Sequence, residues 1–424
     1  MTPWRRCLAA ALLLGALCPA PTARAAERLL EDFATPGRYA PAWQSGALRE
    51  GRDEDLHWLE LTAGGRPGQP EVVLIANREP YQPALDLRGR FLKLWIRVDD
   101  LARLGGMEFR LASQDFDQGY FAFGFTRYAD LDSNIVREGV WNVLTLPFAS
   151  ARVVGRPDRS AIRRVGWYVS DQGTGPVKAW WGGLAAVDEP AEGVVSFTFD
   201  DGYAEHYWAA ERMAKYGMRG TAYVIPSGID KPGYLSSGQL AELEKRFGWE
   251  VAAHHETPLT DFAPAELEGR LLGVQRFLGA RGFARGALHL AYPLGRQNPA
   301  RVRPVARALF TSARVAGGGL ETLPPADRHL LRVFNVVQST RPEEVAEAAR
   351  QARLDRHWLI LMFHFLVERT ERDTEYRRSD FEKLLALVQE TGARVSPLIE
   401  VFEACGELAG EICRLPSRAA APAP

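Results

Sequence analysis

The chain has 424 residues, which is longer than one hydrophobic core usually supports, so the sequence predicts two domains. Its composition, 46% hydrophobic and 25% charged, is ordinary for a globular protein, and its formal net charge is -1. No long basic run accompanies that charge, which argues against a nucleic-acid-binding surface, so no nucleic-acid partner is expected.

The N-terminus has the pattern of an export signal. Arg5 and Arg6 precede an apolar run over residues 7–17, and Ala23 and Ala25 are small residues at the positions that a signal peptidase recognises. We therefore expect residues 1–25 to be a signal peptide and the mature protein to be periplasmic or secreted. The apolar run is too short to span a bilayer comfortably, so no transmembrane segment is expected after signal removal.

Only two cysteines, Cys405 and Cys413, remain once the signal is removed. In an oxidising compartment a short-loop disulfide that ties down the final helix is expected, and two free thiols are the alternative. The rest of the 405–424 segment is rich in Pro and Ala and is expected to be disordered.

Residues 26–187 alternate apolar and polar side chains with the period of a strand. Gly, Pro, Asp and Asn separate most of the runs. The expected strands are 57–62, 71–76, 91–98, 107–113, 120–126, 141–148, 164–170 and 177–187. Eight short strands without clear helices predict an antiparallel β-sandwich.

Among the tryptophans on these expected strands, Trp95, Trp167, Trp180 and Trp181 are the candidates for a flat aromatic platform. Flat aromatic rings can stack on sugars, so the sandwich is a candidate carbohydrate-binding domain. The alternative is that most of them pack in the core, because large aromatic side chains dominate buried area. Trp180 and Trp181 are adjacent, so one of the two must face away from the core.

A short acidic segment with Pro and Gly, residues 188–193, is the expected linker, and the period changes after it. Apolar runs at 194–199, 220–226, 249–254, 286–293, 311–315, 331–336, 357–363 and 393–398 alternate with helical stretches at 204–216, 236–247, 263–281, 299–309, 342–353 and 378–392. Strands that alternate with helices predict a parallel sheet, and seven or eight such units over 194–404 predict a barrel.

Chemically reactive side chains collect at the ends of these strands. Asp200 and Asp201 end the first strand, His254 and His255 a later one, and His364 the last apolar run. In barrels of this type the active site lies at the C-terminal ends of the strands. Two adjacent carboxylates at the end of a buried strand are costly, and either a metal ion or a proton held between the two acids would explain them.

Four segments in this order resemble the motifs of polysaccharide deacetylases of the NodB-homology class, carbohydrate esterase family 4. They are Thr198-Phe-Asp-Asp-Gly202, Trp249-Glu-Val-Ala-Ala-His254, Ala291-Tyr-Pro-Leu-Gly295 and Trp358-Leu-Ile-Leu-Met-Phe-His364. The resemblance covers essentially the whole second domain. It implies a distorted (β/α)7 barrel that removes acetyl groups from an acetylated polysaccharide with a divalent metal, commonly Zn²⁺.

The resemblance also implies roles for individual residues. Asp201 and His254 would bind the metal, and Asp200 would take a proton from the attacking water. His364 would protonate the leaving amine, and the backbone N–H of Tyr292 would hold the oxyanion. Leu294 and Phe363 are candidates for a small wall around the acetyl methyl group.

The chain departs from the family at the second motif, because Pro258 stands where members usually carry a second metal histidine. His255 is the favoured third ligand, and an exposed loop residue is its alternative role. Glu256 or His206 are the other candidates within reach of the rim, whereas His289 lies within an expected strand and is expected to pack in the barrel.

Arg314 ends the expected 311–315 strand, and it is the candidate partner that orients Asp200, with a surface arginine as the alternative. The sequence thus predicts an exported metal-dependent deacetylase. A non-catalytic polysaccharide-binding protein on a degenerate barrel is the second hypothesis, because one histidine is missing. Hydrolysis of a small non-sugar amide is the third. The sequence indicates no oligomeric state.

Overall fold

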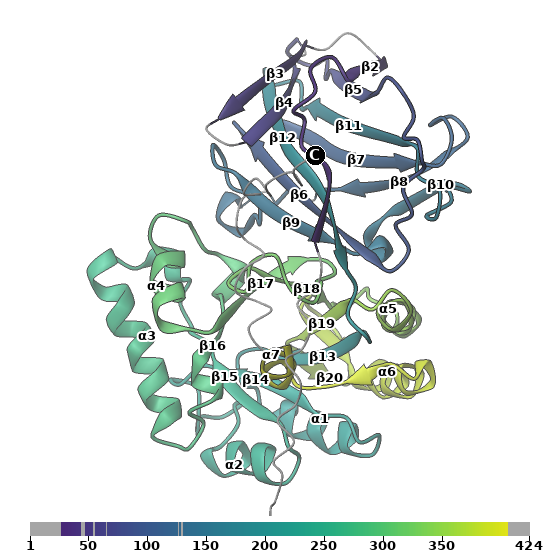
Figure 1. Cartoon of the computed structure of the whole chain (residues 1–424). Coiled ribbons are helices and arrows are strands. Elements are labelled where there is room, and N and C mark those ends of the chain that lie inside the picture. Colours follow the sequence, from purple (N-terminus) through teal and green to yellow (C-terminus); the bar gives the residue numbers. More distant parts are fainter. Residues whose placement is uncertain are drawn as a thin grey trace, which may run out of the picture.

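The computed structural model describes residues 27–43, 47–53, 56–64, 66–125, 127–128 and 130–405. They form two domains that stack on each other, with the strand-rich N-terminal part above a barrel surrounded by helices (Figure 1). The expected signal peptide, the tail and Cys413 of the expected disulfide lie outside the described residues.

The first domain is an antiparallel β-sandwich, as predicted. One sheet has the order β3-β4-β12-β6-β9 with β1 paired to β12, and the other has the order β10-β8-β7-β11-β5-β2. The strands are β1 (Glu27–Glu31), β2 (Tyr39–Trp43), β3 (Ala47–Asp53), β4 (Leu56–Ala63), β5 (Val72–Asn77), β6 (Arg90–Val98), β7 (Leu104–Ala112), β8 (Gly119–Gly124), β9 (Asn142–Leu146), β10 (Arg152–Gly155), β11 (Arg164–Asp171) and β12 (Val177–Asp188).

Two of the four tryptophans considered as a sugar platform belong to the sandwich core. Trp167 and Trp181 are at most 2% exposed, and their rings pack 4.7 Å apart. Trp95 is also buried, but it lies on the other face of β6, where Lys93 Nζ is 4.7 Å from its ring centre. Trp180 is the member of the adjacent pair that faces outward, and the Arg97 guanidinium lies 4.4 Å from its ring centre. The core alternative therefore holds for Trp167 and Trp181.

The second domain is the predicted parallel barrel. Its strands are β13 (Val194–Phe199), β14 (Gly220–Val224), β15 (Glu250–Ala253), β16 (His289–Ala291), β17 (Ser312–Gly318), β18 (Leu331–Asn335) and β19 (Trp358–Phe363). They follow one another around the sheet, and β13 pairs with both β14 and β19 and so closes it. The short β22 (Arg394–Val395) adds to β13 at one end, and β20 (Phe365–Val367) pairs with β21 (Glu375–Arg377) beside the barrel.

Helices cover the outside of the barrel because each has one apolar face. They are α1 (Glu205–Ala214), α2 (Ser237–Lys245), α3 (Pro264–Gly279), α4 (Val302–Leu309), α5 (Pro342–Leu354), α6 (Arg378–Thr391) and α7 (Leu398–Cys405). In α3 the buried residues Leu267, Leu271, Val274 and Leu278 repeat at helical spacing. A capping box of Ser236 and Gln239 begins α2.

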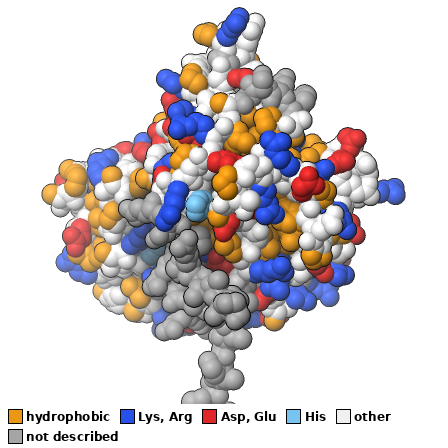
Figure 2. All heavy atoms as spheres, turned by 45° about the horizontal axis from the view of Figure 1, so that its top comes forward, with side chains coloured by type: hydrophobic (Ala, Val, Ile, Leu, Met, Phe, Trp, Pro, Cys, Tyr) orange, Lys and Arg blue, Asp and Glu red, His pale blue; other side chains and the backbone are white. Residues whose placement is uncertain are grey.

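The surface carries both signs of charge. On the face shown in Figure 2, basic and acidic side chains are interspersed with apolar ones. Within the described residues, no helix combines the length and the apolar character needed to cross a bilayer.

Buried histidines should make folding stability depend on pH, and His289 is the cleanest case. It lies in β16 with Nδ1 2.8 Å from the hydroxyl of Ser312, and burial lowers its pKa from 6.5 to about 4. Between about pH 6.5 and pH 4, His289 is therefore protonated in the unfolded chain but neutral in the folded chain. The free energy of unfolding consequently decreases as the pH is lowered through this range.

His289→Asn should remove this dependence while keeping a group that can bond Ser312. We expect the variant's free energy of unfolding to fall less steeply than that of the wild type between pH 6.5 and 4, by about 1.4 kcal/mol per pH unit. Urea titrations at several pH values measure the slopes. Equal slopes for the two proteins would contradict the assignment.

Candidate active site

The site begins where β13 ends. Asp200 is buried, and its backbone N–H donates to the carbonyl of Phe363 on the neighbouring strand at 2.9 Å. Asp201 follows with φ +72° and Gly202 with φ +79°, so the backbone turns at both residues. A left-handed aspartate is strained, and such strain is found where a fold must aim a side chain.

Asp200 forms an ion pair with Arg314, which lies within β17. The Arg314 side chain is fully buried, so the surface alternative does not apply. Its guanidinium also lies 3.2 Å from the carbonyl of Val315 and 4.6 Å from the ring centre of Tyr223. Burial lowers the pKa of Arg314 to about 9, so it remains charged at neutral pH and holds a compensated carboxylate in place.

Asp201 faces His254, which follows β15, with Oδ1 3.3 Å from Nε2. The other ring nitrogen, Nδ1, lies 2.8 Å from the carbonyl oxygen of Ala291. A carbonyl can only accept, so Nδ1 carries the proton and Nε2 of a neutral ring presents a lone pair to the carboxylate. Burial raises the pKa of Asp201, whereas a proton on Nε2 of His254 would give the carboxylate a hydrogen bond and a positive neighbour, which together lower its pKa to about 2.

Two acceptors that face each other in this way repel unless a cation or a proton lies between them. A backbone carbonyl that fixes the tautomer of a histidine is also the usual support of a metal-ligating ring. The Asp201–His254 pair therefore fits a divalent metal ion on its donor chemistry. Among the described residues no third His, Cys, Asp or Glu completes a group of three.

His255 is turned into its own loop. Its Nδ1 accepts a hydrogen bond from the backbone N–H of Thr257 at 3.0 Å, and its ring packs edge-on against Phe262 at 5.2 Å. The structure therefore does not bring His255 together with Asp201 and His254, and its assignment as a ligand stays a prediction. Pro258 begins the short turn Leu259–Asp261 and carries no ligand.

The two other histidines considered as ligands are core residues. His206 on α1 is fully buried with Nε2 2.8 Å from the carbonyl oxygen of His364, and His289 bonds Ser312 inside the barrel. Both are held by contacts that explain their burial without a metal.

His364 follows β19 on the opposite side of Asp200, with Nε2 3.9 Å from Oδ2. Burial lowers its pKa to about 4, and the nearby charge of Asp201 only partly opposes this. At neutral pH His364 is therefore a neutral imidazole. It can accept a proton from Asp200 or pass one to a group in the site.

The backbone N–H of Tyr292 is not free to bind an oxyanion, which corrects the role expected from the sequence. It donates to the carbonyl of Arg314 at 2.9 Å within the sheet. The next residue, Pro293, has no N–H, so the first later amide is that of Leu294. Leu294 has φ +56° and a side chain that is 71% exposed, so it lies at the rim. Phe363, the other expected wall residue, packs in the core against Phe199 at 5.2 Å.

Tyr203 is a site residue that the sequence analysis missed. Its hydroxyl interacts with the Asp201 carboxylate, which contributes to raising the pKa of Tyr203 after burial. Its ring stacks on Phe365 with centres 3.8 Å apart and packs against Tyr234 at 5.4 Å. The only signal in the sequence is its place two residues after Asp201. The three half-buried rings make an aromatic surface beside the acceptor pair.

Residues 188–311 match the family described as "Polysaccharide deacetylase". This segment contains the Asp200–Asp201 turn and the His254 loop. The first part of the barrel is therefore similar to polysaccharide deacetylases. Arg314 and His364 lie beyond the matched segment but complete the same rim.

A curated relative, "Putative polysaccharide deacetylase YxkH" of Bacillus subtilis (strain 168), is 27% identical over 113 residues. That alignment covers 26% of this chain, and the chain spans 40% of the relative's length.

Two solved structures are similar to different parts of the chain. One is the Xyl-CE4 domain of a multidomain xylanase from the hindgut metagenome of Trinervitermes trinervoides, which is 15% identical in sequence. The match covers 51% of this chain and 92% of the xylanase domain, with a TM-score of 0.34. The family 11 carbohydrate-binding module of the cellulase Lic26A-Cel5E of Clostridium thermocellum is 10% identical, covering 38% and 95%, with a TM-score of 0.29.

Arg314→Met should destabilise the barrel strongly. It leaves the Asp200 carboxylate buried without its partner, so we expect the free energy of unfolding to fall by about 3–5 kcal/mol. Arg394→Met is the control, because it breaks an exposed ion pair with Glu192 and should cost about 1 kcal/mol or less. Equal losses in the two variants would show that Asp200 does not depend on Arg314.

His255→Ala should leave the metal content of the purified protein unchanged, because the ring is held by its own loop. His254→Ala is the positive control and should lose the metal. Elemental analysis after dialysis measures both. If His255→Ala loses metal as His254→Ala does, the loop rearranges on binding and His255 is the third ligand.

Proposed function

We propose that this protein is an exported, metal-dependent deacetylase that hydrolyses acetyl groups, principally N-acetyl groups, of a polysaccharide. The observation that carries the proposal is the acceptor pair of Asp201 and His254 next to the buried Asp200–Arg314 ion pair. The pair supports a cation site, and the second carboxylate supplies a base beside it. The similarity to polysaccharide deacetylases supports acetylated glycans as the substrate class.

Asp201 and His254 would hold the metal, for which Zn²⁺ is the first candidate because it accepts one carboxylate oxygen and one imidazole nitrogen. Such an ion lowers the pKa of a bound water to about 7 and polarises a carbonyl. With two protein ligands in place, room remains for water and substrate.

Asp200 is the proposed general base. Arg314 keeps it ionised and fixes its orientation, so its free oxygen can take the proton of the water that attacks the acetyl carbon. His364 Nε2, at 3.9 Å from Asp200, is the proposed proton donor to the leaving amine. Because His364 is neutral at rest, the proton that it gives is the one that Asp200 has taken from water. The C–N bond breaks, the second proton of the attacking water also passes to the amine, and acetate and an ammonium group result.

The backbone N–H of Leu294 is the proposed hydrogen-bond donor to the oxyanion. The amide of Tyr292 is used by the sheet, Pro293 has none, and the left-handed conformation of Leu294 places its backbone at the rim. A backbone donor fixed in advance costs no reorganisation during the reaction.

A sugar substrate is supported by the aromatic surface of Tyr203, Tyr234 and Phe365 beside Asp201. In the sandwich, a groove of about 590 Å³ lined by Phe116, Tyr120 and other residues of the second sheet is where a glycan chain would bind. We propose that the sandwich holds the polymer there.

The second hypothesis, a polysaccharide-binding protein that has lost its metal, draws its support from the group of only two ligands in the described residues. The buried Asp200–Arg314 pair opposes it, because binding sugar needs no compensated carboxylate at that position. Hydrolysis of a small non-sugar amide fits the same catalytic groups but gives the sandwich no role.

Asp200→Asn and Asp201→Asn separate the two carboxylate roles. Asp200→Asn should lower acetate release by about 10²–10⁴-fold with metal content near that of the wild type, because it removes the base. Asp201→Asn should lose both activity and metal. Acetate release from an N-acetylglucosamine oligomer and an O-acetylated xylan oligomer is measured beside elemental analysis.

The wild type must release acetate from at least one of the two substrates. An inactive wild type that binds no metal would favour the binding-protein hypothesis. Equal loss of metal in both Asp variants would overturn the division of roles between the two carboxylates.

A further inference from the structure

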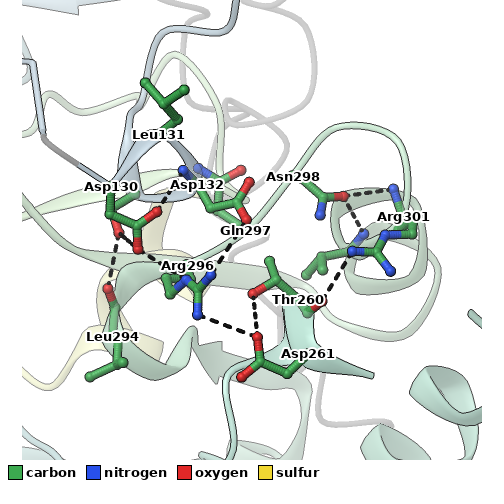
Figure 3. A network of polar contacts seen from close by, with 12 residues as sticks. Asp130, Leu131, Asp132, Thr260, Asp261, Leu294, Arg296, Gln297, Asn298 and Arg301 are labelled. Atoms are coloured by element: carbon green, nitrogen blue, oxygen red, sulfur yellow. Dashed lines mark hydrogen bonds and ion pairs between the residues drawn. The ribbon is translucent and has the colours of Figure 1, made fainter. Parts of the chain in front are cut away.

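The sandwich contacts the barrel at the edge of the active site. The segment 130–137, which contains the short turn Leu131–Ser133, leaves the sandwich and lies against the barrel loop that follows β16 (Figure 3). This loop contains Leu294. The contacts are between residues more than 150 positions apart, so they join the two domains.

Arg296 lies at the centre of these contacts. Its Nε is 3.0 Å from Asp130 and its Nη2 is 3.8 Å from Asp132, both in the sandwich, while its Nη1 is 3.3 Å from Asp261 in the barrel (Figure 3). An isolated exposed ion pair contributes little, but one guanidinium among three carboxylates forms a network with a fixed geometry.

The neighbours of Arg296 are bound by the sandwich through their backbones. The N–H of Gln297 donates to the carbonyl of Asp132 at 2.9 Å, and the carbonyl of Gln297 accepts a hydrogen bond from Arg137. The hydroxyl of Ser133 donates to the carbonyl of Leu294 at 3.3 Å. The proposed oxyanion donor therefore sits in a loop fixed from the other domain.

This loop needs outside support because it is strained. Leu294 and Gly295 are both left-handed, with φ +56° and +67°, and a Cβ on Gly295 would come within 2.7 Å of the backbone nitrogen of Ala316. A left-handed non-glycine residue is strained and persists only where its surroundings hold it. Here part of those surroundings belongs to the sandwich.

The same network reaches the loop that carries His254. Asp261 ends the short turn after that loop, and the Thr260 carbonyl beside it accepts a hydrogen bond from Arg301 at 3.0 Å (Figure 3). Through Arg296, the sandwich is thus tied to both rim loops: the one that follows the metal-binding histidine and the one that presents Leu294.

We propose that Asp130, Asp132 and Arg296 are positioning residues for deacetylation, and that the sandwich is an integral part of the catalytic unit rather than a tethered module. This inference rests on the proposed function. Asp130 and Asp132 hold Arg296, Arg296 holds the 294–297 loop, and the loop holds the Leu294 N–H where the oxyanion forms. Displacement of such a donor affects the transition state more than substrate binding.

The test is Asp130→Asn combined with Asp132→Asn, which removes both charges and keeps the backbone hydrogen bond to Gln297. We expect kcat on the N-acetylglucosamine oligomer to fall about 10- to 100-fold, with KM within about twofold and unchanged metal content. The control is Glu79→Gln with Asp86→Asn, which removes two exposed charges of the sandwich, one of them paired with Arg88. It should keep wild-type kcat.

Arg296→Met should reproduce the loss, and Arg296→Lys should restore part of it, because Lys keeps the charge but cannot span three carboxylates. Hydrogen exchange should be faster at residues 292–297 in the Asp130–Asp132 variant than in the control. An active wild type with equal kcat in the double variant and the control overturns the inference alone.

If the wild type releases no acetate, the proposed function fails, and the catalytic role of these residues fails with it. The exchange measurement then decides separately whether the sandwich holds the loop. Equal exchange at residues 292–297 in the variant and the control would overturn the structural part as well.

Discussion

The structure depends on how the barrel tolerates carboxylates where a buried strand ends. Asp200 is compensated by a fully buried arginine, and Asp201 is left facing the lone pair of His254. The charge of Asp200 is balanced by the protein's own arginine. The Asp201–His254 pair, in contrast, needs a cation or a proton between its two acceptors to be stable. Asp200 is thus a carboxylate held ready to act as a base, Asp201 is part of a site for an ion, and the proposed mechanism follows from this difference.

The second feature is that the rim is not built by the barrel alone. The loop that presents Leu294 contains two left-handed residues, and its bonds to Ser133, Asp130 and Asp132 come from the sandwich. The relation between the domains is therefore different from that of a binding module joined by a linker. The sandwich carries the groove proposed for the glycan and also contacts the loop that presents the proposed oxyanion donor.

Much of this could be predicted from the sequence. The change from a period of two to alternating strands and helices separates the domains. The apolar run before Asp200 locates the site, because burying a carboxylate at the end of such a strand costs free energy unless a partner compensates its charge. β2 and β3 were missed because one contains Pro41 and the other is mostly exposed and charged, so neither shows clean alternation. The role expected for the Tyr292 N–H was wrong because a motif does not say which backbone amides the sheet already uses. The role expected for Phe363 was wrong because its ring packs in the core against Phe199. The contacts of Arg296 could not be predicted, since ion pairs between distant loops leave no periodic pattern.

The central claim is that a divalent cation binds between Asp201 and His254. The most direct measurement is a crystal structure of the protein grown with Zn²⁺, with anomalous diffraction recorded at the zinc edge. The account predicts one strong peak per chain within bonding distance of Asp201 Oδ1 and His254 Nε2, with Asp200 beside it and still paired with Arg314. A map with no peak there, or a hydrogen-bonded Asp201–His254 pair closed upon itself in the presence of the metal, would contradict it.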